Sequence, residues 1–235
     1  MTENRENHQP ISEALHTDCV AYMRSLPDKY FDLAIADPPY NNAGVKAHDP
    51  RGRFGGRFDK YRDTSDTSPT AWDVAPPQEF FDELRRVSCH QIIWGGNFFA
   101  MPPAKCFLVW VKTNIPEKFT MAMCEYAWTS LTGNAKVFYH SSMRDKQSGH
   151  FHPTEKPIAL YQWLLQNFAQ PGQRIFDPMM GSQSSRIAAY AMGYDYYGCE
   201  LDAGYYQRGC ERFDQHCRDI TPAASNGQPR QLRLF

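Results

Sequence analysis

The sequence predicts an α/β protein with one doubly wound, mainly parallel sheet and helices on both faces. Short apolar runs with strand character alternate with segments of helical spacing. Acidic residues recur directly after such runs, as they do where parallel strands end at a ligand-binding edge. The chain has 235 residues, 42% of them hydrophobic, which is enough for one sizeable core.

Seven segments have the length and composition of β-strands and are bounded by polar or turn-forming residues. In chain order the predicted strands are 11–16, 31–36, 90–94, 106–111, 124–129, 173–177 and 195–199. Helical segments separate most of them, so most neighbouring strands are expected to be parallel.

Three segments have apolar residues at helical spacing. These residues are Phe80, Leu84 and Val87, then Ile158, Tyr161, Leu165 and Phe168, and last Tyr206, Cys210, Phe213 and Cys217. Pro157 suits a first helical turn, Gly193 a C-terminal stop and Asp202 an N-cap. One domain is expected over residues 1–219, followed by a flexible tail at 220–235.

Composition excludes several classes of protein. The apolar run Cys106–Val111 is far shorter than the ~20 residues of a membrane helix, and the polar start MTENRENHQP lacks the apolar stretch of a signal peptide. Seven cysteines without a C-x-x-C pair predict reduced thiols in the cytoplasm and no metal site. The net charge is −1, so any contact with nucleic acid requires a local basic surface.

The string Asp37-Pro38-Pro39-Tyr40 follows the apolar strand FDLAIA and carries the strongest chemical signal. Two consecutive prolines fix two φ angles, so the Pro38 carbonyl is held beside the Asp37 carboxylate. Two acceptors side by side suit an exocyclic amine, which has two N–H bonds to donate. Tyr40 adds a flat ring on which a flipped base can stack. The alternative is a proline-rich turn that only ends a strand.

This string resembles the motif of the amino methyltransferases that modify exocyclic nitrogens of DNA bases. The resemblance implies a Rossmann-like methyltransferase fold, S-adenosylmethionine as cofactor, and Asp37, Pro38, Pro39 and Tyr40 as catalytic residues. The catalytic string precedes the cofactor loop along the chain, which is the beta-group order of these enzymes. WGGN at 94–97 and W-x-K at 110–112 look like family scaffold without chemistry.

The cofactor loop of the family resembles Asp177-Pro178-Met179-Met180-Gly181-Ser182, a strand end, a small-residue turn and the opening of a helix. Gln183 departs from the family pattern, which usually has a second glycine there. Glu200 is placed to accept hydrogen bonds from ribose hydroxyls or, alternatively, only caps a helix. The resemblance assigns cofactor binding to Asp18, Lys156, Asp177, Pro178, Gly181, Ser182 and Glu200.

Two segments are candidates for contact with DNA. The first, a Gly- and Arg-rich mobile loop within 41–75 that we call the basic loop, has six Lys or Arg and two Asp between residues 44 and 62. The second, 131–151, occupies the place of the family's target-recognition insert and is short. The predicted DNA-binding residues are Arg51, Arg53, Arg57, Lys60, Arg144 and Lys146.

The sequence therefore predicts a site-specific DNA methyltransferase, of the kind found in restriction–modification, that forms N6-methyladenine. The resemblance favours adenine because cytosine-N4 enzymes more often have Ser in place of Asp37. Three alternatives remain: an N4-cytosine enzyme, an RNA or protein-glutamine N-methyltransferase, and a non-catalytic DNA-binding accessory protein suggested by Gln183.

The C-terminal pentapeptide Gln231-Leu232-Arg233-Leu234-Phe235 is joined through a Pro-, Ser- and Gly-containing tether. Its apolar side chains either fold onto the protein's own core or a second copy in a homodimer, or they bind a partner. The peptide resembles the motif by which bacterial replication and repair proteins bind the DNA sliding clamp. On that interpretation Gln231, Leu232, Leu234 and Phe235 contact the clamp.

Overall fold

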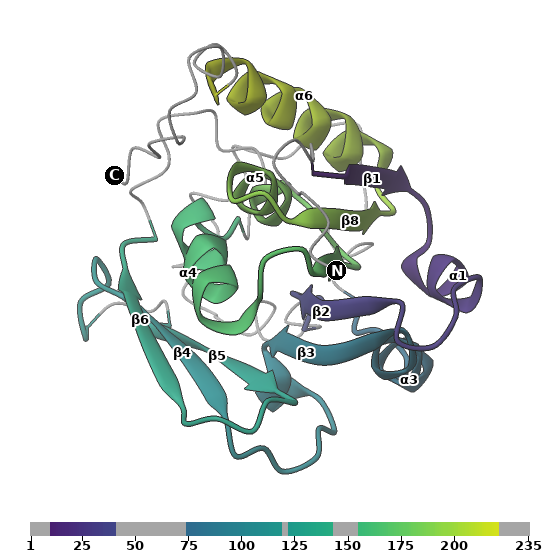
Figure 1. Cartoon of the computed structure of the whole chain (residues 1–235). Helices are drawn as coiled ribbons and strands as arrows, with labels where there is room; N and C mark the ends of the chain where they lie inside the picture. The colour runs from purple at the N-terminus through teal and green to yellow at the C-terminus, as the bar shows by residue number, and fades with distance from the viewer. Residues whose placement is uncertain (1–9, 41–73, 119–121, 143–154, 221–235) are drawn as a thin grey trace, which may run out of the picture.

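The computed structural model describes residues 10–40, 74–118, 122–142 and 155–220. Within these residues one eight-stranded sheet has the order β1-β8-β7-β2-β3-β5-β4-β6 (Figure 1). The strands are β1 (Ser12–His16), β2 (Phe31–Ala36), β3 (Ser88–Trp94), β4 (Phe107–Lys112), β5 (Cys124–Thr129), β6 (Lys136–His140), β7 (Arg174–Asp177) and β8 (Asp195–Glu200). The helices are α1 (Cys19–Arg24), α3 (Gln78–Val87), the 3₁₀ turn η2 (Gly96–Phe98), α4 (Ile158–Phe168), α5 (Ser184–Ala191) and α6 (Ala203–Ile220).

The sheet is mainly parallel, as the sequence predicts. Strands β1, β8, β7, β2 and β3 pair in parallel, and β4 pairs in parallel with β6. Strand β5 is antiparallel to both β3 and β4. Its first residues therefore lie at the same edge of the sheet as the last residues of its neighbours.

The predicted count of seven strands is wrong, because β6 forms within the segment expected to be a target-recognition insert. Strand β6 is a five-residue edge strand that pairs only with β4 among the described residues, with Val137 opposite Val109. Its Val137 and Tyr139 are exposed, whereas Phe138 packs against Trp163 of α4. Such a short, one-sided strand gives a weak pattern of alternation.

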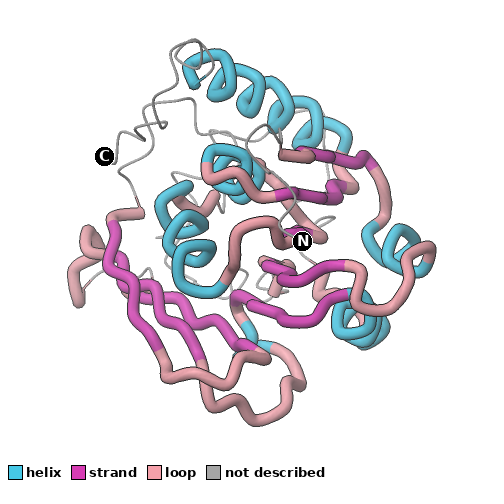
Figure 2. The backbone as a smooth tube through the Cα atoms, in the orientation of Figure 1, coloured by secondary structure: helices cyan, strands magenta, loops and turns pink. Residues whose placement is uncertain are grey.

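Helices cover both faces of the sheet (Figure 2). On one face Leu33 and Ile35 of β2 belong to a core with α4 and α5. On the other face Ala34 and Ala36 belong to a core with α1 and α3. The strand FDLAIA is thus buried on both sides, which explains why its sequence is a nearly continuous apolar run.

Helix boundaries largely follow the predicted signals. Gly193 follows α5 with φ of 78°, the left-handed conformation expected after a helix, and Asp202 caps α6 by accepting a bond from the Tyr205 N–H at 2.8 Å. Pro157 is the N-cap of α4 and not a first-turn residue, because Ile158 begins the helix. No helix in the described ranges is long and apolar enough to cross a membrane.

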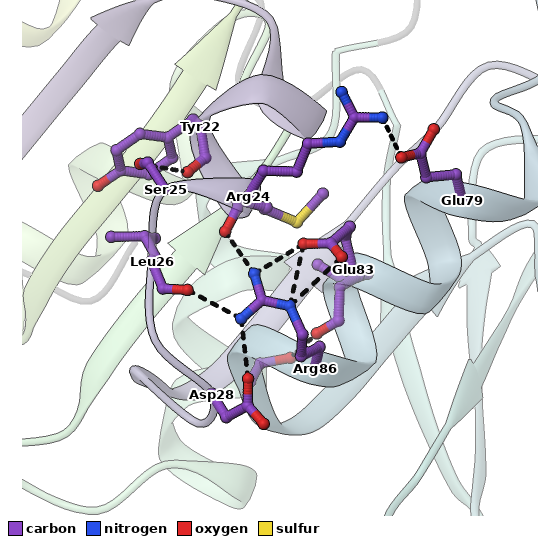
Figure 3. A network of polar contacts seen from close by, with 11 residues as sticks. Tyr22, Arg24, Ser25, Leu26, Asp28, Glu79, Glu83 and Arg86 are labelled. Carbon is purple, nitrogen blue, oxygen red and sulfur yellow. Dashed lines mark hydrogen bonds and ion pairs between the residues drawn. The ribbon is translucent and has the colours of Figure 1, made fainter.

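Arg86 of α3 joins the two helices that precede and follow β2 (Figure 3). Its guanidinium donates to the carbonyls of Met23 and Leu26 at 2.7 and 2.8 Å and pairs with Asp28 and Glu83. These carbonyls lie at and beyond the end of α1, where no intrahelical partner exists. The network fixes the turn that leads into β2, and so the strand that ends at Asp37.

Candidate functional site

The predicted acidic residues meet at one edge of the sheet. Asp37 follows β2, Asp177 ends β7 and Glu200 ends β8, and these three strands are neighbours in the order β8-β7-β2. Asp18 follows β1, which lies on the other side of β8. The carboxyl ends of adjacent parallel strands are where open α/β sheets bind ligands.

The Asp37 carboxylate is held at both oxygens. The Tyr40 hydroxyl donates to Oδ1 at 2.6 Å, and the Lys156 ammonium pairs with Oδ2. Burial, and next the charge of Asp37, raise the pKa of Tyr40, so its hydroxyl remains a donor. The Asp37 side chain is 18% exposed and therefore lies at the border between the interior and the surface.

The Tyr40 ring packs closely against the WGGN segment. Phe98 stacks on it with ring centroids 4.9 Å apart, and Phe99 meets it edge-on at 6.1 Å. Gly95 has φ of 67°, and a Cβ there would lie 2.0 Å from Cε1 of Tyr40. The glycine is therefore required for the ring position, so this segment, expected to be scaffold, shapes the site.

Lys156 connects Asp37 to a second ion pair. Its ammonium lies 3.3 Å from Oε2 of Glu125, and Oε1 of Glu125 lies 2.7 Å from the ammonium of Lys112. The Lys156 side chain is 4% exposed. Burial by itself lowers the pKa of Lys156, but Asp37 and Glu125 outweigh burial and raise it, so the ammonium stays charged.

Glu125 stays ionised in this row of alternating charges. Burial alone would raise its pKa, but the ammonium groups of Lys156 and Lys112 outweigh burial and hold the pKa below its ordinary value. We name Asp37, Lys156, Glu125 and Lys112 the charge row.

The loop after β7 is organised around Asp177. Its Oδ1 accepts from the Met179 N–H at 3.1 Å, and its Oδ2 accepts from the Ser185 hydroxyl at 2.6 Å. The Ser185 oxygen also lies 2.9 Å from the Tyr196 hydroxyl. Burial raises the pKa of Asp177 to about 7, more than the two hydrogen bonds lower it. Asp177 therefore anchors the turn to α5.

Glu200 bridges the turn at Gly181 and the start of α6. Its Oε2 accepts from the Gly181 N–H and its Oε1 from the Asp202 N–H, both at 2.9 Å. Burial raises its pKa. The side chain thus has the capping role considered from the sequence. A carboxylate has about four lone-pair sites, so further donors such as hydroxyls can still bind.

Gln183 stands in a backbone conformation that favours glycine, with φ of 61°. Its side chain is fully buried and turns to α6, where Nε2 donates to the Tyr206 carbonyl at 3.3 Å. Its Oε1 accepts from Arg186 at 2.9 Å. These bonds offset the strain of a non-glycine residue. The departure at Gln183 therefore has a structural role that leaves the turn in a glycine-like conformation.

A buried ion pair links this turn to the segment that carries Lys156. Arg212 of α6 donates to the Ser182 carbonyl at 2.7 Å and to the Ser184 hydroxyl at 2.9 Å. It pairs with Glu155 at 2.8 Å, and the two side chains are only 6% and 8% exposed. Residues 155 and 156 thus contact Arg212 and Asp37, respectively.

The remaining predicted residues divide into two groups. Asp18 is the N-cap of α1, where its Oδ1 accepts from the Ala21 N–H at 2.8 Å. The predicted DNA-binding and tail residues lie outside the described residues: Arg51, Arg53, Arg57, Lys60, Arg144, Lys146, Gln231, Leu232, Leu234 and Phe235. The described ranges contain no group of three or more side chains suited to a metal ion.

Sequence reasoning missed Glu125, Phe98 and Arg212. Glu125 opens an antiparallel strand, so its place at the carboxyl edge follows only from the direction of β5. The stacking of Phe98 on Tyr40 depends on the η2 turn. An arginine inside a polar helix gives no sequence signal for burial, since most are exposed.

Comparison with known proteins agrees with this arrangement. A family model described as DNA methylase, N6_N4_Mtase, matches residues 93–210. The methylase named YubD of Escherichia coli K12 is 26% identical over 230 residues, covering 92% of this chain and 96% of its own.

Two solved structures share the fold. A DNA modification methylase of Thermus thermophilus, complexed with S-adenosyl-L-methionine, has a TM-score of 0.54 at 17% identity over 88% of this chain and 94% of its own. The cytosine-N4-specific PvuII DNA methyltransferase has a TM-score of 0.59 at 12% identity over 89% and 92%.

Proposed function

The chain belongs to the N6_N4_Mtase family of DNA methylases, and on this premise we propose that it methylates the N6 amino group of a flipped-out adenine in DNA. The proposed methyl donor is S-adenosylmethionine, with which the Thermus thermophilus relative was crystallised. S-adenosylmethionine supplies an electrophilic methyl group on a sulfonium ion.

One observation carries the proposal: the Asp37 carboxylate and the Tyr40 ring lie at the end of β2, directly beside the strand that carries the turn at Gly181. Asp37 accepts the amine N–H bonds, with the Pro38 carbonyl as a second acceptor and Pro39 fixing the turn. Tyr40 supports the base. As the N–C bond forms, the amine becomes cationic and then releases a proton, so Asp37 acts mainly by orientation and charge.

Several residues of this chain suit the cofactor. The turn of Asp177, Pro178, Gly181 and Ser182 leads into the N-terminus of α5, which favours a carboxylate. Glu200 suits ribose hydroxyls and Asp18 the adenine end. We assign Lys156 a part in orienting Asp37, because its ammonium is already shared between two carboxylates.

Adenine is the preferred target because Asp37 stands where cytosine-N4 enzymes more often have Ser. The fold does not discriminate, since the cytosine-N4-specific PvuII enzyme shares it. We therefore keep N4 of cytosine as the second candidate. Methylation of RNA or a protein glutamine amide would instead favour a motif that begins with Asn.

DNA is the proposed partner, and the sliding clamp is a second one. The pentapeptide at 231–235 would tether the enzyme to newly made DNA and raise its effective concentration there. A synthetic pentapeptide should bind purified bacterial clamp at micromolar strength, measured by fluorescence polarisation. No binding at high clamp concentration would remove this partner. The proposed DNA contacts are Arg51, Arg53, Arg57, Lys60, Arg144 and Lys146.

The substitution Asp37→Ala tests the proposed role of this carboxylate. It should abolish methyl transfer to DNA and leave the cofactor dissociation constant, measured by calorimetry, within about threefold of wild type, because Asp37 is assigned to the amine. Lys156 keeps Glu125 as its partner, so the melting temperature should show a folded variant. A variant that keeps most of the wild-type turnover would refute the role.

A further inference from the structure

Glu125 has no part in the proposed function so far, yet it lies in the charge row. Its register opposite Trp110 places it at the end of β4, and the antiparallel direction of β5 brings it to the carboxyl edge. Its two oxygens are divided between Lys156 and Lys112. The Lys112 side chain is only 10% exposed and that of Lys156 only 4%, so these pairs are screened little by water.

We propose that Glu125 is a positioning residue for methyl transfer that acts on Asp37 through Lys156. The inference rests on the proposed function and extends it to a residue with no direct contact to the base. Glu125 has two effects: it holds the Lys156 ammonium in place against Oδ2 of Asp37, and it neutralises that ammonium.

Neutralisation matters because positive charge moves onto the amine nitrogen as the N–C bond forms and the C–S bond breaks, its electron pair remaining on sulfur. Asp37 stabilises that charge, and the nearby Lys156 ammonium opposes it. Glu125 offsets the ammonium. Without Glu125, the whole charge of Lys156 would fall on Asp37 and compete with the amine for its acceptor sites.

Lys156 itself is held in a narrow space. Its ammonium lies 5.6 Å from the ring centroid of Trp94, at the end of β3, and its backbone lies directly before Pro157, the N-cap of α4. Trp94 is fully buried. The ammonium therefore has two carboxylates and an aromatic face as neighbours, and loss of one carboxylate changes its balance toward Asp37.

The test compares steady-state kinetics of Glu125→Gln with wild type. Glutamine keeps the shape and removes the charge, so kcat should fall by ~10- to 100-fold, while KM for cofactor and for DNA stays within about twofold. The matched control is Glu117→Gln, an exposed glutamate in the turn after β4, which should keep the wild-type kcat. A wild type without methyl transfer to DNA would refute the proposed function and not this inference.

A second variant separates positioning from structural support. Glu125→Gln alone leaves Lys112 half-paired in a mostly buried position, which destabilises the fold. Lys112→Met/Glu125→Gln removes that charge as well, so its melting temperature should return toward wild type, whereas kcat stays low because Lys156 still lacks Glu125. Recovery of wild-type kcat in the double variant, an unchanged kcat in Glu125→Gln, or a loss confined to KM would each overturn the inference.

Discussion

The substitution Arg212→Met should destabilise the fold strongly, and the structure supplies the magnitude. Arg212 contacts Glu155, the Ser182 carbonyl and the Ser184 hydroxyl at distances of 2.7 to 2.9 Å. Methionine keeps the apolar stem but leaves the Glu155 carboxylate buried without this charge. Removing one partner of a buried ion pair costs about 3–5 kcal/mol of unfolding free energy. For a chain of this size, that lowers Tm by ~6–20 °C.

Denaturant unfolding followed by circular dichroism measures this loss, with Arg208→Met as the matched control. Arg208 is exposed on the same helix, so its replacement should change the unfolding free energy by no more than ~0.5 kcal/mol. Glu155→Met/Arg212→Met removes both charges and should recover most of the loss. A loss below ~1 kcal/mol in Arg212→Met, or a double variant as unstable as the sum of the two single variants, would refute the reasoning.

Three further predictions concern the cofactor site and the basic loop. Glu200→Ala should weaken cofactor binding by ~1.5–3 kcal/mol in calorimetry, since a charge-assisted hydrogen bond is removed, and an unchanged dissociation constant would reduce Glu200 to its capping role. Folded Asp177 keeps its proton up to a pKa of about 7, whereas the unfolded chain releases it near 3.8, so stability should fall by up to ~4 kcal/mol between pH 4 and 7. Asp177→Asn should remove that fall in urea titrations, and an identical pH profile would contradict it. Neutralising the first three arginines of the basic loop should weaken DNA binding and reduce its salt slope by ~1 for each phosphate that is no longer neutralised; an unchanged slope would exclude phosphate binding by these arginines.

The part of the fold that the sequence predicts well is the part fixed by local patterns. The sequence predicts strand β2 with its bounds because a strand buried on both faces has a continuous apolar run. The chemistry of Asp202 and Gly193 alone assigns them to helix ends, and the structure confirms both. The placement of Asp37, Asp177 and Glu200 at one edge follows from the parallel order of the strands.

The features that the sequence does not predict depend on contacts between distant segments. Strand β6 is stabilised by pairing with β4 and packing on α4, and neither leaves a strong mark in five residues. Glu125 enters the site only because β5 is antiparallel. The partners of Lys156 are not predictable either, because a lysine before a proline-capped helix is usually solvated, and here two carboxylates bury it.

The most direct test of the central claim is the identity of the methylated base. Purified wild-type protein is incubated with unmethylated DNA and S-adenosylmethionine that carries an isotope-labelled methyl group, and the DNA is digested to nucleosides for mass spectrometry. We predict label in N6-methyldeoxyadenosine, and none when Asp37→Ala replaces the wild type. Label in N4-methyldeoxycytidine would contradict the assignment to adenine, and DNA without label would contradict the claim that this protein is a DNA methyltransferase.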